Sequence, residues 1–146
     1  DEKIAECLNK LNENSKPKWG ILTPQHLLEH LEQGYRIMSG EIQDFEIATP
    51  EKILDKVHNS LYNYDKFPLG TKFPTMKKDE LEDLIHPDFE IAKTKFFEAR
   101  ENYKTFFKEN PEAILKNMVF GEMNKYASYL LERKHLNHHF EQFNIL

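Results

Sequence analysis

The stretch TPQHLLEHLEQGYRIM, residues 23–38, decides the fold class of this 146-residue chain. Thr23 is a favourable residue for capping a helix N-terminus. Pro24 suits the first helical position, because its missing N–H would have no intrahelical partner there. Apolar side chains then recur at steps of three and four residues, and Gly40 follows as a stop signal. Gly34 lowers the helix propensity without ending the pattern, so the segment predicts one amphipathic helix.

Other parts of the chain carry similar helical patterns, and signals for strands are missing. Apolar spacing predicts further helices over about 2–12, from the Thr49-Pro50 start signal to about 62, from after Pro87 to about 108, and from about 124 to 142. A short helical stretch is expected over 79–85 and a loop over 63–76. No Asn-Gly or Asp-Gly hairpin signal occurs. We therefore expect an all-α protein, a single domain over 1–146 folded as an antiparallel four-helix bundle.

The composition excludes several classes of protein. The net charge of -5 argues against a nucleic-acid-binding surface, which would be basic. No apolar run approaches the roughly 18 residues of a membrane span. A single cysteine, Cys7, excludes an internal disulfide framework and a cysteine-based zinc ribbon. Neither end resembles a signal or transit peptide, so we expect a cytoplasmic protein without membrane or nucleic-acid partners. The oligomeric state stays open, with a homodimer as one option.

Five of the seven histidines fall into two groups that suggest a metal site. His26 and His30 lie in the predicted helix over 23–38, and His135, His138 and His139 lie in the last predicted helix. Histidines four residues apart share a helix face, about 40° apart around the axis, and can bind one ion. A third imidazole from a facing helix would complete a three-ligand site with an open position. Apolar residues share these faces, so the ion is expected inside the bundle.

Other interpretations of the same residues remain open at this stage. Histidine pairs at this spacing also occur on exposed helices, and buried histidines can form a hydrogen-bonded polar cluster. The Glu132-x-x-His135 spacing is that of two-metal bundles, but the nearest second motif is Asp83-x-x-His86, which Pro87 follows at once. Glu132 is more simply expected to face solvent. The chain lacks the His-Glu-x-x-His motif, which argues against a metalloprotease.

Two sequence motifs resemble those of a known family. WGILTP at 19–24, followed by a helix that contains His30, is similar to the N-terminal signature of the DinB-like superfamily. VFG at 119–121 and KHLNHHFEQF at 134–143 resemble the closing motif of its short-chain bacterial branch, whose function is unknown. The two signatures bracket nearly the whole chain, although its middle third carries no such motif.

The resemblance implies a fold and a set of metal ligands. DinB-like proteins are four-helix bundles with up-down-down-up topology, and many bind one divalent metal through three histidines. Carried onto this chain, the ligands are His30 from the second helix and His135 and His139 from the last. His138 would point to the side, and His26 stands where relatives more often have Gln, which leaves a rearranged or four-histidine site open. A three-histidine site accepts Zn, Ni, Mn or Fe.

The resemblance also implies a class of chemistry. Some members are transferases or isomerases that use bacillithiol, mycothiol or glutathione, so a small-molecule substrate is expected, in thiol chemistry or in hydrolysis. Three neutral imidazoles leave the metal its full charge, which would lower the pKa of a bound water or thiol toward neutrality. The alternative is a non-enzymatic bundle whose histidines hold a structural metal or form a polar cluster.

Three further residues are candidates for roles around the site. Gln142 lies one turn beyond the histidine group and is expected to orient a ligand or a bound water. Trp19 would wall the mouth of the pocket or plug the end of the bundle. Tyr35 points about 140° away from His30 around the helix, so it is expected to be an interior aromatic whose hydroxyl reaches water.

Overall fold

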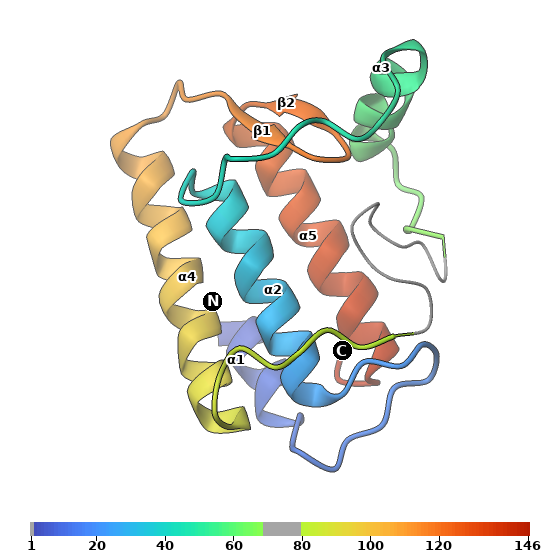
Figure 1. Cartoon of the computed structure of the whole chain (residues 1–146), viewed down its shortest axis with the longest axis vertical. Helices are drawn as coiled ribbons and strands as arrows, with labels where there is room; N and C mark the ends of the chain where they lie inside the picture. Colours follow the sequence, from blue (N-terminus) through green and yellow to red (C-terminus); the bar gives the residue numbers. More distant parts are fainter. Residues whose placement is uncertain (1, 69–79) are drawn as a thin grey trace.

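The computed structural model describes residues 2–68 and 80–146, which form a mainly helical protein (Figure 1). The prediction of a helical fold is confirmed, and a small two-stranded hairpin accompanies the helices. The elements, in chain order, are α1 (Glu2–Asn9), α2 (Pro24–Met38), α3 (Glu51–Asn59), the 3-10 helix η1 (Ser60–Tyr62), α4 (Phe89–Glu109), β1 (Leu115–Asn117), β2 (Gly121–Met123) and α5 (Lys125–Gln142). Within the described ranges, no helix combines the length and the apolar character that crossing a bilayer requires.

The three longest helices begin where their capping residues place them. Thr23, Asp88 and Asn124 each accept a hydrogen bond from the backbone N–H three residues further on, at 3.4, 2.8 and 2.9 Å. These side chains satisfy N–H groups that have no partner within the helix. The start of α2 and the start of α5 are therefore as the sequence predicts.

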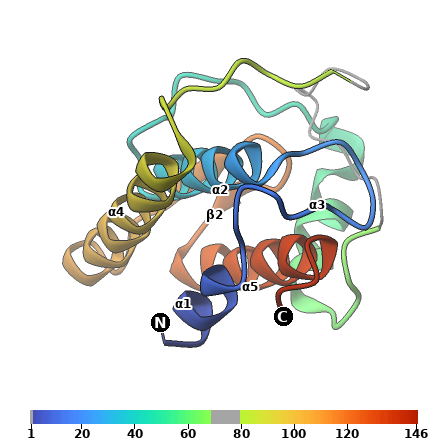
Figure 2. The same ribbon diagram turned by 90° about the horizontal axis from the view of Figure 1, so that it is seen from below.

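Helices α2, α4 and α5 lie side by side, with α1 on the far side of the view (Figure 1). Seen from below, α1 lies on the side of the molecule opposite α2 (Figure 2). These helices carry most of the largest fully buried apolar side chains, which include Leu8, Leu27, Leu28, Leu31, Tyr35 and Phe96. The aromatic side chains of α4 contribute to this core, with Phe89, Phe96, Tyr103 and Phe107 buried and Phe106 packed against it half-buried. This core sets the positions of α2 and α5.

The prediction that the chain contains no strands is wrong, because residues 115–123 form a hairpin. Strands β1 and β2 pair antiparallel, with Asn117 opposite Gly121. The Asn117 Oδ1 atom accepts hydrogen bonds from the N–H groups of Val119 and Phe120, at 2.9 and 3.0 Å, and so closes the turn. Gly121 has φ +73°, which favours glycine. An Asn four residues before a Gly was the available signal, and it is weaker than an adjacent Asn-Gly pair.

The start of α3 also differs from the prediction. Thr49 does not cap this helix, because its hydroxyl donates to the Val119 carbonyl at 2.7 Å. The helix begins at Glu51 instead, and none of its residues is buried. Helix α1 is shorter than predicted, since it ends at Asn9. Residues 63–68 carry no regular structure, as predicted, and the rest of that predicted loop lies outside the described residues.

Residues 80–85 are not helical, so the short helix predicted over 79–85 is wrong there, and Asp79 lies outside the described residues. The segment instead crosses α2 (Figure 1). The Glu29 carboxylate accepts the N–H groups of Ile85 and His86 at 2.8 and 3.0 Å, and Gln25 Nε2 donates to the His86 carbonyl at 2.7 Å. These backbone groups therefore find their partners on α2 rather than in a helix of their own. Burial alone would raise the pKa of Glu29, but the hydrogen bonds from the Ile85 and His86 N–H groups and from Gln25 hold this pKa below its usual value.

Glu132 lies in the interior, contrary to the expectation that it faces solvent. It is 7 % exposed, and its Oε1 atom accepts hydrogen bonds from the Tyr35 hydroxyl at 2.8 Å and from Arg100 Nε at 3.2 Å. Tyr35 is interior as expected, but its hydroxyl binds Glu132 instead of water. Burial and the Glu132 charge raise the pKa of Tyr35, which stays a neutral donor. This cluster joins α2, α4 and α5.

Removing the charge of Glu132 should destabilise the protein strongly. A Glu132→Gln substitution keeps the side-chain volume but removes the anion beside Arg100, and breaking such a buried ion pair costs about 3 kcal/mol. Urea denaturation measures the free energy of unfolding. Glu101→Gln is the matched control, because Glu101 pairs with Lys104 on the surface of α4 and should change stability by less than about 1 kcal/mol. Equal effects of the two substitutions would contradict the role given to Glu132.

Candidate metal centre

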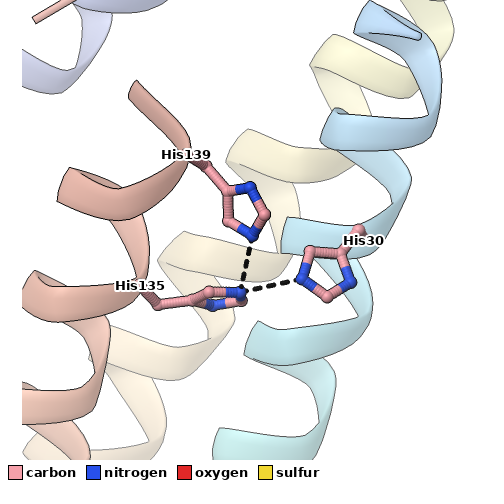
Figure 3. Close-up of side chains that lie close together, drawn as sticks. All are labelled: His30, His135 and His139. Atoms are coloured by element: carbon pink, nitrogen blue, oxygen red, sulfur yellow. Dashed lines mark hydrogen bonds between the residues drawn. The ribbon is translucent and has the colours of Figure 1, made fainter. Parts of the chain in front are cut away.

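Three imidazole rings from α2 and α5 meet at one point (Figure 3). The Nε2 atom of His135 lies 2.8 Å from His30 Nε2 and 3.1 Å from His139 Nε2. One nitrogen from each ring lies within 4.8 Å of the others, the spacing of a group that could hold a metal ion. Within residues 2–68 and 80–146, this is the only group of at least three His, Cys, Asp or Glu side chains with that geometry.

The geometry follows from helix periodicity and from the small residue at position 34. His135 and His139 are four residues apart in α5 and share the helix face that meets α2. A Cβ atom built on Gly34 would lie 3.5 Å from His135 Cε1, an ordinary contact distance. A larger side chain at this position would therefore enter the space of the ring. The small residue at position 34 thus leaves this space to the His135 imidazole, one turn from His30.

Gln142 determines which nitrogen of His139 carries the proton. Its Nε2 donates to the Trp19 carbonyl at 2.8 Å, which leaves its Oε1 as the acceptor 2.8 Å from His139 Nδ1. The His139 proton is therefore assigned to Nδ1, and the lone pair of Nε2 faces the other two histidines. A hydrogen bond to the remote ring nitrogen is the usual means by which proteins orient a metal-binding histidine.

The three histidines are neutral at physiological pH. His135 and His139 are each 7 % exposed. Burial lowers the pKa of His30 to about 4 and that of His139 to about 3, and neighbouring imidazoles add to the effect. Burial, together with His139 and His30, holds the pKa of His135 well below its usual value. Neutral imidazole is the form that binds a transition metal.

The donor set fits one divalent transition metal. A tetrahedral site with metal–nitrogen bonds of 2.0–2.1 Å places its nitrogens about 3.3 Å apart, close to the two distances observed here. A neutral imidazole nitrogen either donates or accepts. His135 Nε2 can supply at most one proton to its two close neighbours, whereas a cation would engage all three lone pairs together.

The other sequence candidates lie around the three-histidine centre in different ways. His26 has both ring nitrogens engaged, Nδ1 with Thr23 Oγ1 at 2.6 Å and Nε2 with the Glu82 carbonyl at 2.9 Å. His138 is half-buried, and its ring centroid lies 5.1 Å from that of His139 and 5.8 Å from that of Trp19. His26 therefore attaches the segment before α4, while His138 and Trp19 extend the cluster from the side of His139.

The two-metal interpretation finds no support in the described residues. His86 Nε2 contacts Glu32 Oε2 at 2.6 Å, and Glu132 is engaged by Tyr35 and Arg100. Neither Glu132 nor His86 belongs to the group that could hold an ion.

A scan against protein-family models, a search of curated proteins and a search of solved structures each found no match for this chain. The interpretation of the centre therefore rests on its geometry, and the DinB-like resemblance remains a resemblance.

Metal-free protein should lose stability as the pH falls below neutrality. The unfolded histidines take up protons near pH 6.5, whereas folded His30 and His139 do so only near 4 and 3. Because the unfolded state then binds more protons, the free energy of unfolding decreases from pH 6.5 to about 4. The slope is about 1.4 kcal/mol per pH unit for each such histidine.

Urea denaturation at a series of pH values in the presence of a chelator tests this dependence. A His139→Gln variant removes one of these titrating groups. Its free energy of unfolding should therefore depend on pH less steeply, by about 1.4 kcal/mol per pH unit. Identical slopes for the two proteins would show that His139 titrates normally in the folded state.

Proposed function

We propose that this chain is a mononuclear metal-dependent enzyme with the DinB-like up-down-down-up four-helix architecture. His30, His135 and His139 would hold one divalent ion, which is Zn, Ni, Mn or Fe. The proposed activity is that of a hydrolase or a thiol-dependent transferase acting on a small molecule. The observation that supports this most strongly is the convergence of three neutral Nε2 atoms at 2.8 and 3.1 Å.

Different residues of the chain would have different roles in such a centre. The three imidazoles carry no charge, so a bound divalent metal supplies Lewis-acid chemistry and lowers the pKa of a water or thiol ligand. Gln142 keeps the His139 proton on Nδ1 and fixes the plane of the ring. The burial of His135 and His139 excludes bulk water from that side of the centre, which strengthens electrostatic interactions there.

A non-enzymatic role is the second candidate, and one observation favours it. The imidazole nitrogens contact one another directly, as they would in a closed polar cluster or around a structural ion. A structural ion would leave no coordination position that exchanges with solvent. The two roles therefore differ in whether an added ligand reaches the metal.

The wider setting follows from the same proposal. We propose a small-molecule substrate, with a low-molecular-weight thiol as the first class to screen, and no nucleic-acid or membrane partner. A cytoplasmic location is proposed as well, and the oligomeric state stays open, with a homodimer as one option. Size-exclusion chromatography with light scattering measures the oligomeric state.

The metal content of the purified protein tests the proposed centre. Without use of a nickel column, elemental analysis should find about one transition metal per wild-type chain and almost none in His135→Ala. The variant removes one nitrogen from the centre and leaves a cavity beside Gly34.

The matched control is His26→Asn, which alters a histidine of α2 outside the centre, whose ring nitrogens contact Thr23 and Glu82. This variant should keep its metal. Absence of metal from wild type, with no thermal stabilisation by added Zn, Ni or Mn, would contradict the proposal. Equal loss from His26→Asn and His135→Ala would show that metal retention reports the stability of the fold and not these ligands.

A further inference from the structure

Trp19 has a buried hydrogen-bond donor that nothing in the described part of the chain satisfies. Its indole Nε1 atom is shielded from solvent and has no partner among the described residues. An indole nitrogen donates one hydrogen bond and accepts none. Leaving such a donor buried and unsatisfied costs about 1–3 kcal/mol, so an acceptor from outside the chain is favoured there.

Residue Trp19 is linked to the three-histidine centre through one contact of its backbone and one contact of its side chain. Gln142 Nε2 binds the Trp19 carbonyl and Gln142 Oε1 binds His139. The indole ring also packs in a T-shaped arrangement with the His138 ring, which in turn packs against His139. Gly20 permits this approach, because it has φ +77° and a Cβ atom there would lie 3.0 Å from Gln142 Nε2.

Phe67 extends the same wall from another part of the chain. Its ring centroid lies 6.3 Å from that of His138. Lys134 holds the preceding residues against α5, since its Nζ donates to the Ser60 carbonyl at 2.7 Å and to the Asp65 carbonyl at 2.9 Å. The indole, the phenyl ring and the half-buried His138 thus combine apolar surface with the unused N–H group of an indole that contacts the ring next to His139.

We propose that Trp19 forms an acceptor-binding subsite of the centre, in which the indole N–H donates a hydrogen bond to an oxygen of a ligand held by the three-histidine site. The ligand class is a small oxyanion or carboxylate with an apolar body, because the walls are aromatic and the donor is single. This rests on the proposed function. It assigns to Trp19 a role in recognition, in place of a plug at the end of the helices.

The chain contains a single tryptophan, so one indole N–H signal in a nitrogen–proton correlation spectrum reports this subsite alone. Zinc is added to the purified full chain, binding is verified by elemental analysis, and acetate is then titrated as the probe. The indole proton signal should move downfield and saturate with acetate. In His135→Ala, which lacks the metal, the same titration should leave the signal in place.

A Trp19→Phe variant removes the donor and keeps an aromatic ring. With Co²⁺ in place of zinc, the visible spectrum reports acetate binding, and the dissociation constant for acetate should rise about five- to tenfold while Co²⁺ affinity is unchanged. Phe67→Leu alters the wall but keeps the donor, so it should change that constant less than twofold.

The outcomes separate the subsite from the metal centre. If wild type binds zinc but the indole signal ignores saturating acetate, or if Trp19→Phe binds acetate as wild type does, the subsite is overturned and the metal centre stands. If wild type binds neither zinc nor Co²⁺, both proposals fall. The spectrum of the wild-type protein decides the matter even if Trp19→Phe does not fold.

Discussion

Polar side chains join α2 and α5 at two neighbouring levels, and the candidate site depends on both. At one level His30 meets His135, and at the other the Tyr35 hydroxyl binds Glu132. Buried polar groups stabilise a fold only when each finds a partner. The two helices therefore have a spacing at which both contacts form, and Arg100 from α4 balances the negative charge of Glu132.

This arrangement explains why the centre can be both buried and well positioned. The contacts of Glu132 with Tyr35 and Arg100 hold α5 against α2 and α4, because breaking a buried ion pair is strongly destabilising. At the level of the histidines, Gly34 leaves room for the His135 ring, and Gln142 orients His139 from the C-terminal end of α5. The imidazoles are thus held by residues one turn away on either side, as a preorganised metal site requires.

Local signals predicted much of this molecule, and contacts between distant segments account for what was missed. The caps at Thr23 and Asn124 fixed the starts of α2 and α5, and the four-residue spacing of His135 and His139 placed both rings on one face. Glu132 was misplaced because a charged residue on a helix is usually exposed, and nothing near it in the sequence reveals that Arg100 lies opposite.

The same limit explains the errors in the connecting segments. Residues 80–85 carry a helix-like pattern, yet Glu29, more than fifty positions earlier, binds their backbone N–H groups. The hairpin was missed because its strands have three residues each and its turn uses the Asn117 side chain. His30, the third histidine of the group, was predicted to join the other two from the DinB-like resemblance, and the packing of the core does bring its helix against α5.

X-ray absorption spectroscopy of the zinc-loaded protein tests the central claim most directly, because it counts and identifies the atoms bound to the metal. The account predicts three imidazole nitrogens at about 2.0–2.1 Å, with the outer-shell scattering typical of histidine, and one additional light atom. A spectrum with one imidazole or none, or with the metal surrounded only by oxygen atoms, would show that His30, His135 and His139 do not form a metal centre.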